Sequence, residues 1–408
     1  MKKIALLFPG VGSQYVGMSK SLYDNFPIFK ETVDQAGDIL KMDISQLFFS
    51  PEKKEELNKL ENAQAVLLTA SIATYRVFMQ EIGIQPHFCM GHSLGEYSAL
   101  CAAGVIRFPD ALKLVRDRAM VVNEAAARID GTMMWVVNLD VEILEEVCRD
   151  VSEEEGGIYI SAYDSPAQAS ISGVTGVLMK AAKKLEEKGA IVYPLKLSGP
   201  FHCPLMKEAS DKMKPLLQQY NYEKPEYTVI ANRNAVPYKG AESVVDNLSL
   251  QLISPIRWKA SVDYLLEQGT GTGIEIGPKN VLKFLMAKNT NAIKTYTTDS
   301  VKDIETISNE MLLDEDEYLN VIGKCLGAAV STKNRCHDNK VYEEKVIKPY
   351  REVEAIYKKF AESGTPPGKD HVKTAIRMLR AVLPAKEVPR DEQEYWYSKV
   401  VGNKIINF

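Results

Sequence analysis

The chain has 408 residues, 45% of them hydrophobic and 25% charged, and its 50 basic and 54 acidic residues give a formal net charge of −4. This is ordinary for a globular protein, and the absence of a basic block argues against binding to nucleic acid. No run approaches the roughly 18 apolar residues of a membrane-spanning helix, and the short apolar run from Ile4 to Pro9 leads into a glycine-rich turn, unlike a signal peptide.

The cysteines are scattered, with no CxxC pair and no histidine near metal-ligand spacing. They are six in number: Cys89, Cys101, Cys148, Cys203, Cys325 and Cys336. Free thiols in a reducing cytoplasm fit this pattern better than disulfides or a zinc site. We therefore expect a cytoplasmic protein without a metal centre.

The first part of the chain predicts a parallel sheet. Lys3–Phe8 is largely apolar and ends at Pro-Gly, as is typical of a strand buried on both faces. Helical patterns follow at residues 23–40 and 63–81, then a short strand at 88–90 and a helix at 96–103. The order strand, helices, strand, tight turn and helix indicates an α/β fold.

The remaining chain predicts two further regions. Residues 131–198 show the β-α-β-β-α-β order of the ferredoxin-like split motif. We expect this small domain to be inserted into a large domain made of residues 1–130 and 199–298, where the α/β pattern resumes. Residues 299–408 are charged and mostly helical, and they form a C-terminal extension without a motif that predicts catalysis.

The segment Gly91-His92-Ser93-Leu94-Gly95 matches G-x-S-x-G between a predicted strand and a predicted helix. In that context it predicts a nucleophile elbow, in which small residues permit a sharp turn that exposes the serine oxygen above the sheet. The N–H of Leu94 and the helix N-terminus would face negative charge on a bound carbonyl. The alternative is a strand–helix turn that contains a serine by chance.

A serine nucleophile needs a base, and the chain has five histidines. His202 follows the last strand of the small domain, where the chain returns to the large one, and a loop at such a seam lines a cleft. We predict that His202 is the general base and later the general acid; otherwise it is a loop histidine with a surface hydrogen bond. No Asp or Glu is placed as a triad acid, so we expect backbone or amide groups to orient it. The other four precede a strand, point away from the serine or lie in the extension: His87, His92, His337 and His371.

The glycine-rich turn Phe8–Gln14 follows the first predicted strand. One interpretation is a phosphate cradle, although the turn lacks the P-loop lysine and does not match G-x-G-x-x-G. The other is that the backbone N–H of Val11 supplies a second oxyanion donor beside Leu94.

The predicted helix at 109–129 carries Arg118 within an apolar stripe. The stripe is formed by Ala111, Val115, Val122 and Ala125. A guanidinium on a core-facing stripe needs a carboxylate, because an unpaired buried charge is costly, and its fork suits bidentate binding. The partner is either a protein Asp or Glu in a structural ion pair or the carboxylate of a substrate.

Together these segments resemble malonyl-CoA:acyl-carrier-protein transacylases and the related acyltransferases of polyketide synthases. The resemblance runs from Lys3 to about Lys288. It rests on FPGVGSQYVGM, GHSLGEYSAL, the Arg118 helix, SPAQASISG, GPFHCPLM, LQLISPIRW and EIGPKNVL. It implies an α/β-hydrolase-like large domain with a parallel sheet and an inserted ferredoxin-like small domain, as the residue patterns also indicate.

The resemblance implies a ping-pong cycle in which Ser93 takes malonyl from malonyl-CoA and passes it to the phosphopantetheine thiol of an acyl carrier protein. Arg118 would bind the malonyl carboxylate, Gln251 would support His202, and Phe201 fits the malonyl-type pattern. No cofactor is implied, and we expect a monomer. The implied site comprises catalytic Ser93 and His202, oxyanion donors Val11 and Leu94, and substrate-binding Arg118, Gln251, His92 and Phe201.

Some positions depart from the family pattern and bear on the specificity of the acyl pocket: Val11, Ala119, Val122, Asp164 and Arg233. The extension, with YLNVIGKCLGAAV, resembles the linker after acyltransferase domains of polyketide synthases, which favours a free-standing, trans-acting acyltransferase. The alternatives are transfer of an atypical carboxylated extender unit, hydrolysis of stalled acyl-carrier proteins, and a docking scaffold with a dead site. Arg118 argues against the hydrolase, and the intact Ser93, His202 and Gln251 argue against the scaffold.

Overall fold

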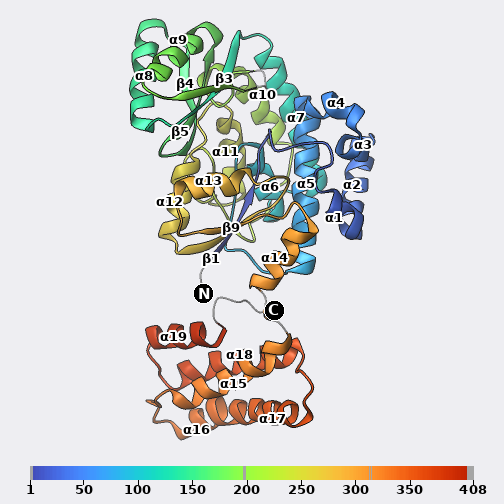
Figure 1. Ribbon diagram of the computed structural model, residues 1–408, viewed down its shortest axis with the longest axis vertical. Coiled ribbons are helices and arrows are strands. Elements are labelled where there is room, and N and C mark those ends of the chain that lie inside the picture. Colours follow the sequence, from blue (N-terminus) through green and yellow to red (C-terminus); the bar gives the residue numbers. More distant parts are fainter. Residues whose placement is uncertain (1–2, 196–198, 312, 314, 402–408) are drawn as a thin grey trace. The chain divides into compact units, whose positions relative to one another are not determined.

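The computed structural model describes residues 3–195, 199–311, 313 and 315–401 (Figure 1). The chain divides into two compact units, one of Lys2–Gln80 with Gln85–Asp303 and one of Glu81–Ile84 with Ile304–Phe408. No helix within the described ranges is long and apolar enough to cross a membrane.

A five-stranded sheet with the order β7-β2-β1-β8-β9 lies at the centre of the first unit. Its strands are β1 (Lys3–Phe8), β2 (Phe88–Gly91), β7 (Thr228–Val229), β8 (Thr270–Glu275) and β9 (Lys294–Tyr296). All neighbouring strands are parallel. Residues 4–8 of β1 are buried, as expected for a central strand covered on both faces. The predicted α/β fold with a parallel sheet is confirmed.

Helices surround this sheet, and α6, α7 and α11 carry residues of the predicted site. They are α1 (Lys20–Asn25), α2 (Pro27–Leu40), α3 (Ile44–Phe49), α4 (Lys54–Asn58), α5 (Leu60–Glu81), α6 (Leu94–Ala102), α7 (Phe108–Ala126), α10 (Lys207–Leu217), α11 (Val244–Gln251), α12 (Trp258–Glu267) and α13 (Val281–Asn289). The helical pattern predicted at 23–40 covers two helices, α1 and α2, and not one continuous helix. Phe26 between them is extended, with φ −121°, because the residue before Pro27 is disfavoured in the helical region.

A separate antiparallel sheet with the order β4-β5-β3-β6 forms the small domain. Its elements are β3 (Gly131–Val137), α8 (Val141–Glu155), β4 (Ile158–Ser165), β5 (Gln168–Val174), α9 (Thr175–Glu187) and β6 (Ile191–Pro194). Both helices pack on one face of the sheet (Figure 1). This confirms the ferredoxin-like arrangement. The predicted last strand continued past Pro194, but residues 196–198 lie outside the described residues.

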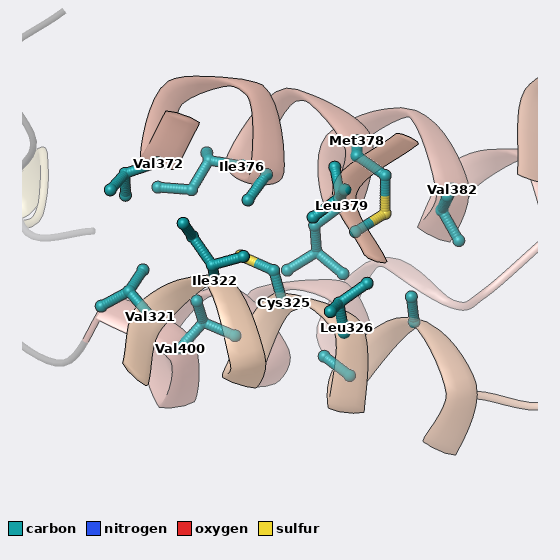
Figure 2. Close-up of a cluster of buried hydrophobic side chains, with 14 of the residues drawn as sticks. Val321, Ile322, Cys325, Leu326, Val372, Ile376, Met378, Leu379, Val382 and Val400 are labelled. Atoms are coloured by element: carbon teal, nitrogen blue, oxygen red, sulfur yellow. The ribbon is translucent and has the colours of Figure 1, made fainter. Parts of the chain in front are cut away.

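The second unit is helical in its described part. Its elements are α15 (Glu315–Ser331), α16 (Asn339–Tyr342), a π-helical segment (Glu343–Ile347), α17 (Lys348–Ser363), α18 (Lys369–Ala385) and α19 (Arg390–Val401), preceded by α14 (Val301–Met311). Aliphatic side chains of α15 and α18 point toward one another in a core of their own, where Ile322 and Cys325 face Ile376 and Leu379 (Figure 2).

Candidate active site

Ser93 lies in a strained turn between β2 and α6. Its φ of 53° and ψ of −106° are uncommon for a residue other than glycine. A Cβ on Gly91 would lie 2.0 Å from the backbone of Gly95, and one on Gly95 would lie 2.0 Å from the carbonyl oxygen of Phe8. The close approach of these backbones therefore explains both glycines of the G-x-S-x-G segment.

His202 contacts the serine directly. Its Nε2 lies 2.8 Å from Ser93 Oγ, and its Nδ1 lies 3.0 Å from the main-chain oxygen of Gln251. Because a carbonyl oxygen can only accept, Nδ1 donates, and Nε2 is left as the acceptor that faces the serine hydroxyl. The orienting group is thus a main-chain carbonyl, and the Gln251 side chain has other partners.

The protonation state of His202 follows from its surroundings. Burial, and then the positive charge of Arg118, lower the pKa of His202 to about 3. A histidine with this pKa is neutral near pH 7, so its Nε2 can take a proton from Ser93.

Two main-chain N–H groups are candidates for oxyanion donors at the serine. Leu94 is the first residue of α6, so its N–H has no acceptor within the helix. Val11 lines the cavity in front of Ser93, and no hydrogen bond of its N–H is found within the described part of the chain. The next N–H, of Gly12, is already bound at 2.8 Å by Gln14 Oε1. The arrangement can therefore stabilise negative charge at a carbonyl bonded to Ser93.

Arg118 on α7 is 5% exposed, and amide oxygens hold its guanidinium. Nη1 donates to Gln64 Oε1 at 2.9 Å, and Nη2 donates to Gln251 Oε1 at 3.2 Å. Nη2 also lies 3.5 Å from Ser93 Oγ, and the guanidinium stands 5.4 Å from the centre of the Tyr97 ring. Among the residues that the structure describes, no carboxylate forms an ion pair with Arg118, and its buried Nε has no hydrogen-bond partner. No carboxylate therefore contacts its charge next to the nucleophile, and Glu96 acts on it only through space and through Gln251.

A buried carboxylate, Glu96, lies beneath the elbow. It accepts from Tyr238 OH at 2.6 Å, from Gln251 Nε2 at 2.6 Å and from the N–H of Asn232 at 3.1 Å. Burial raises the pKa of Glu96 to about 7 although these donors oppose the shift. Gln251 therefore joins Glu96 to Arg118 through the two ends of its amide.

Asn232 holds the elbow from the turn that follows β7. Its Oδ1 accepts the N–H of Ser93 at 2.8 Å, and its Nδ2 donates to the oxygen of Gly91 at 2.6 Å. Sequence patterns identified neither Asn232 nor Glu96 as site residues. A charged residue within the otherwise apolar α6 is the same kind of anomaly as Arg118, and it could have revealed Glu96.

The cavity at Ser93 lies between the two domains of the first unit and has a volume of about 130 Å³. Its lining includes Val11, His92, Ser93, Arg118, Phe201 and His202 from the large domain and Met133, Ala162, Ser170 and Leu195 from the small one. The elbow predicted that His92 points away from Ser93, yet its ring also lines this cavity, and its Nε2 lies 3.0 Å from Asp164 Oδ1. Gln251 is fully buried behind the cavity. No cluster suited to a metal occurs within the described ranges.

Comparison with known proteins gives consistent matches. The model of the acyl transferase domain family matches residues 5–312. A malonyl CoA-acyl carrier protein transacylase of Bacillus subtilis is 34% identical over 397 residues, which cover 96% of this chain and 99% of the relative. Another, from Bacillus subtilis strain 168, is 41% identical over 308 residues, or 75% of this chain and 96% of the relative. The first of these matches is long enough to include most of the second unit.

Solved structures match the first three-quarters of the chain. A type II polyketide synthase acyl-carrier protein in complex with its malonyl-transacylase matches with a TM-score of 0.72 and 36% identity, covering 74% of this chain and 98% of that one. An acyl carrier protein S-malonyltransferase from Vibrio cholerae matches with a TM-score of 0.71 and 35% identity. The match covers 75% of this chain and 99% of that one.

Proposed function

This chain belongs to the acyl transferase family, and we propose that it transfers malonyl from malonyl-CoA through Ser93 to the phosphopantetheine thiol of an acyl carrier protein. The observation that carries the proposal is the 2.8 Å contact between Ser93 Oγ and a neutral His202 Nε2, beside the guanidinium of Arg118, which no carboxylate of the described residues contacts. Relatives that this chain matches over nearly their whole length are named as transacylases of this kind.

Acylation begins when Ser93 Oγ attacks the thioester carbonyl and His202 Nε2 takes the serine proton. The carbonyl oxygen becomes an oxyanion that accepts hydrogen bonds from the N–H groups of Val11 and Leu94. When the intermediate collapses, the carbon–sulfur bond breaks, and His202 returns the proton to the sulfur of CoA. In the second half, His202 takes the proton of the phosphopantetheine thiol, whose sulfur attacks malonyl-Ser93. Collapse then returns the proton to Ser93.

The guanidinium of Arg118 indicates that the transferred acyl group carries a carboxylate. A buried guanidinium that no carboxylate contacts is unfavourable, so a ligand carboxylate that reaches it is bound well, whereas an acetyl group offers it no carboxylate. Other carboxylated extender units would satisfy the same guanidinium. The hydrolase alternative has no use for this charge.

The proposed chemistry uses only groups of this chain and requires no metal or cofactor. We place the reaction in the cytoplasm, because all six cysteines are free thiols. The proposed acceptor is a free carrier protein or a carrier domain of a polyketide synthase that the enzyme serves in trans.

Mass spectrometry of the intact protein tests the proposal. The protein is mixed with malonyl-, methylmalonyl- or acetyl-CoA, and a phosphopantetheinylated carrier protein is added afterwards. We expect a malonyl adduct that moves to the carrier, and no adduct on Ser93→Ala. Ser98→Ala is the matched control, since Ser98 is a buried serine of α6 whose hydroxyl has no hydrogen-bond partner in the described structure.

Two results would contradict the proposal. Loss of the adduct to water without acylation of the carrier would indicate a hydrolase. Absence of an adduct from every acyl-CoA would indicate a docking scaffold with a dead site.

A further inference from the structure

Asp299, just after β9, is bonded by several groups that the reaction does not use. Its Oδ2 accepts from Tyr15 OH at 2.6 Å and from the N–H of Lys279 at 2.9 Å. Its Oδ1 accepts from the N–H and the Oγ of Ser19, at 3.0 and 2.8 Å. Residues 15 and 19 belong to the segment after β1 that also carries Val11. We call residues 9–19 the oxyanion loop.

Lys279 bonds the same loop at a second point. Its Nζ donates to the oxygen of Gly12 at 2.9 Å, one residue beyond Val11. Its own backbone is left-handed, with φ 66°, a conformation that a non-glycine residue keeps only when surrounding contacts hold it. Nearby, a Cβ on Gly277 would lie 3.0 Å from the ring of Pro9. The chain around Lys279 therefore packs against the start of the oxyanion loop.

The oxyanion loop depends on such support because of its composition. It contains Gly10, Gly12 and Gly17. The φ angles of Gly12 and Gly17 are positive, at 108° and 91°. Glycine backbone is permissive, so the loop has little intrinsic rigidity. An oxyanion donor works only when it is preorganised, and a misplacement of about 1 Å can lower a rate about 100-fold.

We propose that Asp299 and Lys279 are positioning residues that hold the oxyanion loop so that the N–H of Val11 faces the carbonyl oxygen of the acyl group on Ser93. The inference rests on the proposed function, in which that N–H stabilises the oxyanion. Neither residue lines the cavity at Ser93. Both act through the backbone between Gly12 and Ser19.

The first test compares Asp299→Asn with Asp303→Asn in single-turnover acylation of Ser93 by malonyl-CoA. An asparagine has one oxygen fewer, so at least one partner of Asp299 loses its acceptor. Asp303 is the matched control, because it accepts from Thr297 Oγ1 and from the N–H and Oγ of Ser300 but bonds no residue of the loop. We expect Asp299→Asn to lower the maximal acylation rate roughly 10- to 100-fold. The malonyl-CoA concentration at half-maximal rate should change less than about twofold, since the oxyanion exists only after attack.

The second test uses Lys279→Met, which keeps the apolar stem and removes the bond to Gly12, with exposed Lys283→Met as its control. A double-mutant cycle adds Val11→Pro, which deletes the N–H itself. In the Val11→Pro background, Asp299→Asn should lower the acylation rate by a much smaller factor than in the wild type.

Equal acylation rates for Asp299→Asn and Asp303→Asn would overturn the inference, as would an unchanged cost of Asp299→Asn in the Val11→Pro background. If Asp299→Asn does not fold, the inference is tested by comparing Lys279→Met with Lys283→Met. Equal acylation rates for these two variants would also overturn the inference. A wild-type protein that forms no malonyl adduct would instead refute the proposed function.

Discussion

Each compact unit buries a cation that neutral oxygens hold, but the two cations lie in different surroundings. In the second unit, the ammonium of buried Lys386 is bound by the main-chain oxygens of Ala329 and Thr332 at the end of α15. These are the carbonyls that a helix leaves without partners, so the charge completes the helix end. In the first unit, Arg118 is held by neutral side-chain amides beside Ser93, and no carboxylate of the described residues contacts it.

The difference shows how a functional site departs from ordinary packing. The core between α15 and α18 is aliphatic, and its stability follows from burial of apolar surface (Figure 2). Around Ser93, buried polar groups and left-handed backbone at Ser93 and His202 are kept although each is unfavourable alone. Such features are retained where a ligand or a reaction uses them.

The largest expected effect is that of His202→Ala. Without Nε2 the hydroxyl of Ser93 has no base, and we expect malonyl transfer to fall by about 10⁴-fold or more. His371→Ala, in the second unit, is the control and should retain the wild-type rate. Initial rates of carrier malonylation measure both, and a loss below tenfold in His202→Ala would contradict the assigned role.

Arg118→Ala should lower kcat/KM for malonyl-CoA by roughly 100-fold or more, because removing one partner of a buried charge pair costs about 2–5 kcal/mol. The same variant should not lose activity with acetyl-CoA, which offers no carboxylate. Arg116→Ala, a half-buried neighbour on α7, is the matched control. Equal losses with both acyl-CoAs would show that Arg118 supports the structure and not the substrate carboxylate.

The pH dependence of malonyl transfer tests the protonation of the buried site, and its expected effects are smaller. With its pKa lowered to about 3, His202 stays neutral far below 6.5, so kcat/KM should show no acid limb with a midpoint near 6.5. The pKa of Glu96 is raised to about 7, so Glu96 titrates in the same region, and Glu96→Gln removes that titration. An inflection near pH 6.5 in both proteins would contradict a neutral His202.

The same shifts affect stability with opposite signs. Between pH 6.5 and 3 the unfolded chain binds the proton that folded His202 excludes, so this contribution to the free energy of unfolding is lost as the pH falls. Folded Glu96 holds its proton more tightly than the unfolded chain, so its contribution is lost as the pH rises through about 7. Urea titrations of wild type and Glu96→Gln across this range should separate the two contributions.

The smallest effect on transfer is expected from the aliphatic core of the second unit. Leu379→Ala removes a side chain that is 1% exposed and should destabilise that unit by about 2–5 kcal/mol. Val330→Ala, at an exposed residue of α15, should change the stability by less than about 0.5 kcal/mol. Denaturant unfolding measures both. A lower malonyl transfer rate for folded Leu379→Ala would show that the second unit contributes to the reaction.

Much of the site was predictable because its signals are local. The elbow at Ser93 depends on glycines within two residues, and Arg118 stands out from the stripe on its own helix. His202 followed from the order of the small-domain strands and from the small number of histidines. The inferences on Ser93 and Arg118 use the sterics or periodicity of a short segment, which the amino-acid order contains directly.

The remaining parts depend on which strands become neighbours. Asn232 meets Ser93, 139 residues away, because β7 pairs with β2. Asp299 reaches Ser19, 280 residues away, because β9 pairs with β8 and β8 with β1. No strand's sequence specifies its neighbour, and the carbonyl of Gln251 that orients His202 has no side-chain signature. Residue types and local turns therefore identified the reacting groups, whereas sheet order and long-range hydrogen bonds supplied the groups that hold them in place.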